Sequence, residues 1–290
     1  MGLPVPRTLS PSKISLFKEC ALAFRYLAID RVEEPPSVAA TKGTLVHRTL
    51  ERLLLDPAAE RSPKRARQHL PAAWEELSCS PDVTGLDIDD DGRDTLLAEA
   101  DALLDRYFTL EDPTTVHPIG LEVMLAADVG NVRIRGILDR LELDADGELV
   151  VTDYKTGRSP SVYDERTRLL GVTVYAYLCE AVLGRRPSRV QLLYLANSEA
   201  IISEPNEQAL RGLRNQIGAI WDTVIRACRN EDFRARPSRR CDWCGYKPIC
   251  PAHGGTGPPS ARRDHDPDQL ALFDLTAMSP SGRRAINTDG

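Results

Sequence analysis

The sequence predicts an α/β or α+β fold built on a mixed central sheet. Helix-like patterns come first, a run of strand-like segments follows, and the rest alternates helix, strand and helix. Two strand-like runs within residues 132–157 flank a tight turn of Asp and Gly, which predicts a β-hairpin in the middle of the chain. No internal repeat interrupts this order. We therefore expect one sheet flanked by helices.

Apolar residues at helical spacing predict the helices in order. They cover residues 8–28, a segment beginning near residue 44, and residues 94–108, 165–183 and 210–225. Ser10 is the expected N-cap of the first helix, which contains Cys20, and His47 is expected in the first turn of the second. Residues 57–93 are polar and contain proline, and they predict no element. Strands are expected at 121–129, in the hairpin and at 191–196.

Composition is ordinary for a globular protein, with 290 residues, 42% of them hydrophobic and 28% charged. No apolar run reaches the ~18 residues that span a bilayer, and the first 13 residues lack an apolar signal core. We therefore expect a cytoplasmic protein without a membrane segment. The formal charge of −6 gives no overall attraction to nucleic acid. Three short basic segments, 61–67, 185–189 and 234–240, could still form local patches, although solvated surface is their commoner role.

Charged residues fall on the apolar faces of the predicted hairpin. Because side chains alternate along a strand, Asp139 shares a face with Leu141, and Asp153 and Lys155 share a face with Leu149. An unpaired charge on such a face is costly to bury, so these residues predict a site for Mg²⁺ or Mn²⁺. The alternative is a buried ion pair between Asp153 and Lys155.

The seven cysteines predict a metal or cluster site more than disulfides in a cytosolic chain. Cys241, Cys244 and Cys250 form a C-x₂-C-x₅-C motif, and Cys20 is a distant fourth ligand. Zinc and an iron–sulfur cluster both accept four thiolates, so the motif leaves the choice open. A shared site would close the long loop between Cys20 and Cys241, which removes roughly 4–5 kcal/mol of chain entropy from the unfolded state. The other cysteines, Cys79, Cys179 and Cys228, are expected to be buried thiols.

Three motifs resemble RecB-like nucleases of the PD-(D/E)XK superfamily. They are residues 136–140 (GILDR), residues 150–157 (VVTDYKTG) and the GxxxH motif at residues 43–47 (GTLVH). The resemblance implies a restriction-endonuclease-like sheet and a metal site. It implies that His47, Asp139 and Asp153 bind the ion, that Lys155 helps to activate water, and that Glu122 supports the site.

The same resemblance extends to a downstream helix and to the cysteines. Tyr175 is similar to the tyrosine of a QxxxY motif that positions substrate, but Gly171 stands where the family has glutamine. The cysteine pattern is similar to that of iron–sulfur nucleases in helicase–nuclease complexes and of CRISPR-associated exonucleases. It implies a [4Fe–4S] cluster, with Zn²⁺ as the alternative, that staples the ends of a domain over residues 1–253.

The composition changes to Gly, Pro, Ser and charged residues from about residue 254, so residues 254–290 are expected to form a disordered tail. Within it, residues 269–273 (QLALF) resemble the peptide by which bacterial repair proteins bind the sliding clamp. Gln269, Leu270, Leu272 and Phe273 would be the anchors. The alternatives are a short helix that packs back on the domain, or a chance match.

We thus expect a metal-dependent DNA nuclease, an exonuclease acting on single-stranded DNA ends in repair or recombination. No phosphate-binding G-x-x-x-x-G-K-[ST] motif is present, so a helicase motor would come from a partner. The main alternative is a non-catalytic iron–sulfur subunit that binds nucleic acid. A serine acyl-enzyme with Ser10-x-x-Lys13 and Lys155-Thr156-Gly157 is disfavoured, because no S-D-N motif lies between them and Ser10 suits a helix cap.

Overall fold

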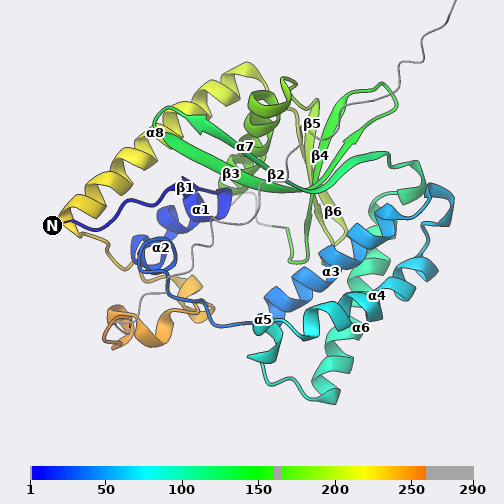
Figure 1. Ribbon diagram of the computed structural model, residues 1–290, viewed down its shortest axis with the longest axis horizontal. Coiled ribbons are helices and arrows are strands. Elements are labelled where there is room, and N and C mark those ends of the chain that lie inside the picture. Colours follow the sequence, from blue (N-terminus) through cyan, green and yellow to red (C-terminus); the bar gives the residue numbers. More distant parts are fainter. Residues whose placement is uncertain (1, 160–164, 259–290) are drawn as a thin grey trace, which may run out of the picture.

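The computed structural model describes residues 2–159 and 165–258. Within these residues, six strands form one mixed sheet in the order β1–β3–β4–β5–β6, with β2 also paired to β3 (Figure 1). The β1–β3 and β4–β5 pairs are parallel and the others antiparallel. The strands are β1 (Thr8–Leu9), β2 (Pro118–Val129), β3 (Val132–Leu143), β4 (Leu149–Lys155), β5 (Arg189–Tyr194) and β6 (Glu199–Ser203). The predicted mixed sheet is confirmed.

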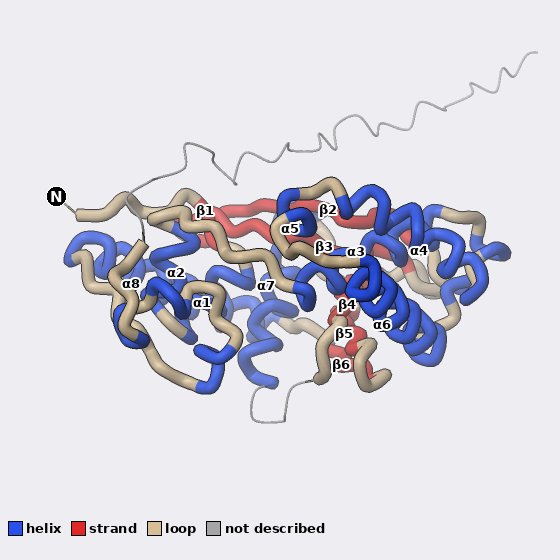
Figure 2. Tube along the Cα trace, turned by 90° about the horizontal axis from the view of Figure 1, so that it is seen from below, coloured by secondary structure: helices blue, strands red, loops and turns tan. Residues whose placement is uncertain are grey.

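Helices lie on both sides of this sheet. They are α1 (Pro11–Glu19), α2 (Ala21–Ala28), α3 (Val38–Leu55), α4 (Pro63–Ser78), α5 (Pro81–Thr84), α6 (Asp90–Leu110), α7 (Glu165–Leu183) and α8 (Glu207–Asn230). The group α1, α2, α7 and α8 lies to one side and the group α3, α4 and α6 to the other, with β4, β5 and β6 between them (Figure 2). No helix within the described residues is long and apolar enough to cross a membrane.

Each helix group buries its own core against the sheet. The first core joins α1, α2, α7 and α8 to residues such as Leu141 and Val151 of the hairpin. The second joins α3, α4 and α6 to Tyr154 and Leu193 on the opposite face. Since alternate residues of β4 serve different cores, both faces of β4 are buried. The charged residues of the hairpin therefore lie between two packed layers.

The prediction of one continuous helix over residues 8–28 is wrong. Residues 8–28 form β1 and then two helices, because Cys20 takes an extended backbone (φ −154°, ψ 105°) between α1 and α2. A tertiary contact supports this break, since the Leu22 N–H in the first turn of α2 donates to the Arg234 carbonyl oxygen. Ser10 does cap α1, accepting from the Lys13 N–H at 3.2 Å, as predicted.

Two further helix predictions need correction. Helix α3 begins at Val38 with Ser37 as its N-cap, so His47 lies in the third turn and not the first. Helix α4 was not predicted, because its buried stripe consists largely of small residues and Pro71 interrupts it. The other predicted helices, α6, α7 and α8, are present and extend at or beyond their predicted limits.

The predicted central hairpin is present. Leu141 pairs with Val151 and Leu143 with Leu149 in antiparallel strands. The turn between them is held by Asp144, whose side chain accepts from the Asp146 and Glu148 N–H groups. The short strands β1 and β6 were not predicted.

Candidate active site

Three possible metal ligands from three different elements converge at the sheet. One ligand atom each of His47 from α3, Glu122 from β2 and Asp139 from β3 lies within 4.8 Å of the other two. An imidazole and two carboxylates suit a hard or borderline divalent ion. The structure therefore brings together three of the residues that the sequence placed at the metal site.

His47 is oriented by the backbone of the neighbouring strand. Helix α3 crosses the end of β4 closely at Gly43, where an added Cβ would lie 3.4 Å from the Thr156 Oγ1. One turn later, Nε2 of His47 lies 3.0 Å from the Tyr154 carbonyl oxygen. A carbonyl only accepts, so Nε2 carries the hydrogen, and in the neutral ring the lone pair is on Nδ1. Nδ1 lies 3.5 Å from the Asp139 Oδ2, so its lone pair is available at the ligand cluster.

Asp139 is held by the same segment of β4. Its Oδ2 accepts from the Tyr154 N–H at 2.7 Å, and the residue is only 9% exposed. Tyr154 thus fixes Asp139 with its N–H group and His47 with its carbonyl group. Burial lowers the pKa of His47. The protonated ring, however, can donate from Nδ1 to Asp139 and is attracted by its charge, and these effects outweigh burial and raise the pKa above the ordinary value.

Glu122 reaches the site through a strained backbone. Its φ of +50° is in the left-handed region, which is unusual for a residue within a strand. Leu121 pairs with Arg140 and Val123 with Leu138, so Glu122 lies opposite Asp139. Desolvation, and then the nearby Asp139 carboxylate, raise the pKa of Glu122 to about 7. Two carboxylates held this close favour a proton or a metal ion between them.

Asp153 and Lys155 lie beside these three ligands as an ion pair. The Lys155 ammonium contacts Oδ2 of Asp153, which is 2% exposed. Burial raises the pKa of Asp153 although Lys155 opposes this. Burial lowers the pKa of Lys155, but Asp153 reverses the effect and keeps the ammonium charged. The ion pair of the alternative interpretation is thus present, with Asp153 buried and Lys155 one-third exposed. The charge of Asp139 in the ligand cluster also raises the pKa of Lys155.

Helix α7 contributes a hydroxyl group to the same carboxylate. The Tyr175 hydroxyl donates to Oδ1 of Asp153 at 3.1 Å. Gly136 of β3 makes room for this ring, because an added Cβ would lie 3.1 Å from both Tyr175 and Leu178. One turn before Tyr175, Gly171 faces Pro11 of α1. A Cβ added at Gly171 would lie 3.7 Å from the Pro11 Cβ. The tyrosine is therefore in contact with the site although the family's glutamine is missing.

The comparisons with known proteins concern the family and the fold of the chain. Residues 8–251 match the PD-(D/E)XK nuclease superfamily. The chain belongs to this superfamily. Its members generally use divalent metal ions, and His47, Glu122 and Asp139 form a candidate site for one. The assignment to the RecB-like branch within the superfamily stays a prediction from the sequence motifs.

One solved structure supports the fold of this PD-(D/E)XK protein. A provisionally assigned exonuclease from Eubacterium rectale aligns with a TM-score of 0.55 at 12% identity, covering 94% of each chain. The protein SSO0001 aligns with a TM-score of 0.36 at 16% identity over 74% of this chain and 95% of that one, which is too distant to carry an argument. No curated protein matches the chain.

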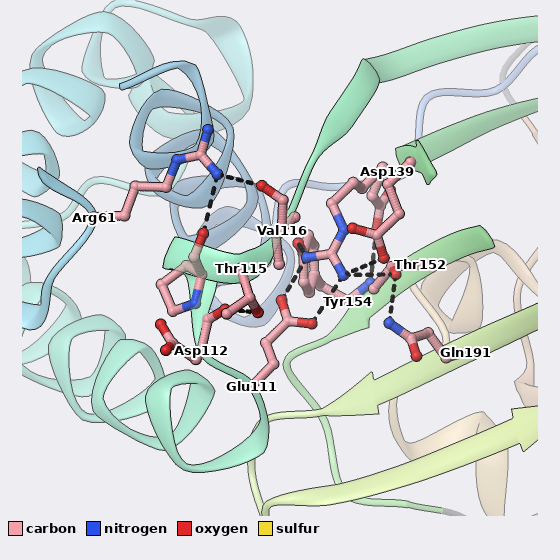
Figure 3. A network of polar contacts seen from close by, with 12 residues as sticks. Arg61, Glu111, Asp112, Thr115, Val116, Asp139, Thr152, Tyr154 and Gln191 are labelled. Atoms are coloured by element: carbon pink, nitrogen blue, oxygen red, sulfur yellow. Dashed lines mark hydrogen bonds and ion pairs between the residues drawn. The ribbon is translucent and has the colours of Figure 1, made fainter. Parts of the chain in front are cut away.

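A buried arginine behind the site was not predicted from the sequence. Arg140 follows Asp139 and points to the opposite face, where its side chain is 0% exposed. It donates to Glu111 with both terminal nitrogens, to the Tyr154 hydroxyl at 2.7 Å and to the Thr152 Oγ1 at 2.9 Å (Figure 3). Glu111 follows the last residue of α6, so this network ties the helical layer to the strands that carry Asp139 and Asp153.

The four motif cysteines come together at a second place in the PD-(D/E)XK domain. Cys20, Cys241, Cys244 and Cys250 line one cavity of about 440 Å³. Two segments form it, since the rings of Tyr26 and Tyr246 meet edge to face at 5.6 Å and the Tyr246 hydroxyl donates to the Val32 carbonyl oxygen. The later segment, shown in orange, lies against α2 although the two are about 220 residues apart in the chain (Figure 1).

The remaining cysteines lie apart from this cavity. Cys179 and Cys228 are buried, as predicted, and burial raises the pKa of Cys179 to about 12. Cys79 is exposed, which contradicts its predicted burial, because it follows the last residue of α4 at a surface turn. The proposed clamp-binding residues 269–273 lie outside the described residues.

Proposed function

We propose that the chain is a Mg²⁺- or Mn²⁺-dependent deoxyribonuclease that hydrolyses phosphodiester bonds. The observation that carries the proposal is the convergence of His47, Glu122 and Asp139 beside the Asp153–Lys155 pair. His47, Asp139 and Asp153 would hold the ion, and Glu122 would complete or support the ligand set. A bound ion would polarise the phosphate and lower the pKa of a coordinated water molecule.

The protein groups around the ion would orient the reactants. The Lys155 ammonium, held by Asp153, would orient the attacking water or offset charge that develops on the phosphate. The Tyr175 hydroxyl would keep Asp153 in place through its hydrogen bond to Oδ1. Tyr154 would keep His47 in the tautomer that leaves Nδ1 for the ion.

The finer assignment is an exonuclease on single-stranded DNA ends that acts in repair or recombination in the cytoplasm, with a helicase partner. Its support is the resemblance to RecB-like nucleases and the shared fold with a provisionally assigned exonuclease. The second candidate function is a non-catalytic iron–sulfur subunit that binds nucleic acid. The retained Asp139, Asp153 and Lys155 set favours catalysis.

A cleavage assay tests the proposal. The wild type and Asp153→Ala are compared on single-stranded DNA, duplex DNA and RNA with Mg²⁺ or Mn²⁺, and end-labelled substrates report polarity. We expect the variant to lose activity by at least about 100-fold, and Asp146→Asn, an exposed carboxyl of the same hairpin, to keep it. A wild type as inactive as Asp153→Ala on every substrate would leave the non-catalytic binding subunit as the function.

We also propose that the four cysteines bind a [4Fe–4S] cluster. The support is the resemblance of the cysteine pattern to that of iron–sulfur nucleases, together with the position of all four cysteines at one cavity. Anaerobic purification with iron and sulfide analysis tests this. A colourless protein that contains only zinc would refute the cluster and leave the nuclease proposal standing.

We propose further that residues 1–253 form the nuclease domain and that the tail binds the sliding clamp through Gln269, Leu270, Leu272 and Phe273. The support is the QLALF sequence in a polar, glycine- and proline-rich segment. Surface plasmon resonance with a bacterial clamp would compare the full chain with a variant in which Leu272 and Phe273 are alanine. Equal binding by both would reject the peptide assignment.

A further inference from the structure

Trp243 is the most exposed large hydrophobic side chain among the described residues, at 79%. Its backbone is nevertheless well fixed. It follows a short 3₁₀ turn, Arg239–Asp242, and its N–H donates to the Arg240 carbonyl oxygen at 3.1 Å. Leaving a whole indole in water forfeits the free energy of burying it. An exposed aromatic ring on a fixed backbone suits a ligand with a flat face.

A cavity of about 530 Å³ begins at this tryptophan. Ser37, Thr41 and Thr44 of the α3 segment also line it. Thr44 lies three residues before His47, so one wall of the cavity belongs to the helix that carries a proposed metal ligand. Near Trp243, the backbone at Gly245 packs closely against Glu34. A Cβ added at Gly245 would lie 2.8 Å from the Glu34 side chain. The volume is that of a typical small-ligand site.

The charges of this cavity select against a phosphate. Glu34, Asp82 and Asp242 line it, and no lysine or arginine is among its described lining residues. Carboxylates accept hydrogen bonds from the amino groups of nucleobases, as they do from the N4 amino group of cytosine. A neutral, flat group that donates hydrogen bonds therefore suits the cavity better than an anion does.

Positive charge lies on the chain immediately around Trp243. Residues 234–247 contain five basic residues and one acidic residue, in a chain whose net charge is −6. Arg236 is exposed and lines the neighbouring cysteine cavity together with Trp243. Its guanidinium donates to the Lys18 carbonyl oxygen, and no carboxylate of the described residues lies within 4.0 Å of it. Arg234, Arg240 and Lys247 are paired with Asp232, Glu19 and Asp242. Arg236 and Arg239 are therefore the cations that this segment offers to a phosphate backbone outside the acidic cavity.

We propose that the cavity takes an unpaired nucleobase of a single-stranded nucleic acid, stacked on Trp243, with the adjoining phosphates at Arg236 and Arg239. The inference rests on the proposed nuclease function and adds to it the site at which one base of the single strand is held. A base within a duplex is already stacked and paired and cannot enter, so the site selects single strands. Bases that carry an exocyclic amino group should be preferred over thymine.

Binding of labelled oligonucleotides without added divalent metal tests the inference. For oligo-dC we expect Trp243→Ala to weaken binding about 5- to 100-fold and Trp243→Phe to stay close to wild type. Arg236→Gln should weaken binding and reduce the slope of log K against log salt concentration by about 0.7. Blunt duplex binding should be unchanged in Trp243→Ala. The matched control is Trp74→Phe, a half-buried tryptophan in α4, which should bind as wild type does.

Tryptophan fluorescence gives a readout that does not depend on the stability of the alanine variant. Oligo-dC should quench the emission of wild type, and this quenching should be missing in Trp243→Phe and present in Trp74→Phe. Equal quenching in wild type and Trp243→Phe, or equal losses of single-strand and duplex binding in Trp243→Ala, would overturn the inference.

These experiments distinguish failure of the base site from failure of the nuclease function. A wild type that cleaves DNA with added metal, while the Trp243 and Arg236 variants bind unchanged, overturns the base site alone. A wild type that binds single strands through Trp243 but cleaves no substrate overturns the nuclease function alone.

Discussion

Replacing Arg140 with methionine tests how strongly the buried network supports the catalytic hairpin. The guanidinium is fully buried and contacts Glu111, Glu142, Thr152 and Tyr154. The variant fills similar space but leaves Glu111 and Glu142, at 15% and 8% exposure, without their cation. Removing one partner of a buried ion pair costs about 3–5 kcal/mol. We expect a loss of that size, a large share of an ordinary total of about 5–15 kcal/mol.

Urea unfolding followed by circular dichroism measures this loss. With a slope of about 3 kcal/mol/M, the midpoint should fall by about 1–2 M. The control is Arg133→Met on the same strand, because Arg133 is half exposed and its pair with Asp128 is 3.5 Å long. Such a surface pair contributes about 0–1 kcal/mol, so its midpoint should hardly move. A loss below about 1 kcal/mol in Arg140→Met would refute the argument.

The loss should also depend on pH. Burial raises the pKa of Glu142 even though Arg140 counteracts it. Without Arg140 this folded-state pKa rises further above the unfolded value of about 4.3, so the folded state binds protons more readily than the unfolded state. The penalty should be largest at pH 8, where the carboxylates are ionised, and smaller at pH 5. A penalty that grows as the pH falls would contradict this electrostatic origin.

Three other predictions concern the metal and cysteine sites. Protons compete with metal at Glu122 near pH 7, so calorimetry should show Mn²⁺ affinity rising between pH 6 and 8 in wild type and rising less in Glu122→Gln; equal slopes would contradict this. Tyr175→Phe removes the hydrogen bond to Asp153 and should lower kcat about 10-fold with little change in Mn²⁺ affinity; unchanged kcat would exclude a positioning role. Cys20→Ser should lose iron or zinc and lower the Tm, whereas the buried control Cys179→Ser should keep its metal content; full metal content in Cys20→Ser would reject a four-cysteine site.

Much of the site could be predicted because its residues lie in short sequence motifs. The hairpin follows from alternation and turn chemistry over residues 132–157, and these patterns placed Asp139 and Asp153 on neighbouring strands before any packing was known. The alternation that fixes these strand faces is a property of the backbone alone. The C-x₂-C-x₅-C motif is equally local, because its three cysteines lie within residues 241–250.

Other features could not be read from such patterns. The left-handed backbone of Glu122 depends on its pairing with β3, and the extended backbone of Cys20 accompanies a contact with residue 234. The burial of Arg140 depends on Glu111 at the end of α6, 29 positions away. Each arrangement joins segments whose registers are set by packing both faces of the sheet at once. Their energies arise from contacts between distant residues, which no periodicity along the chain encodes.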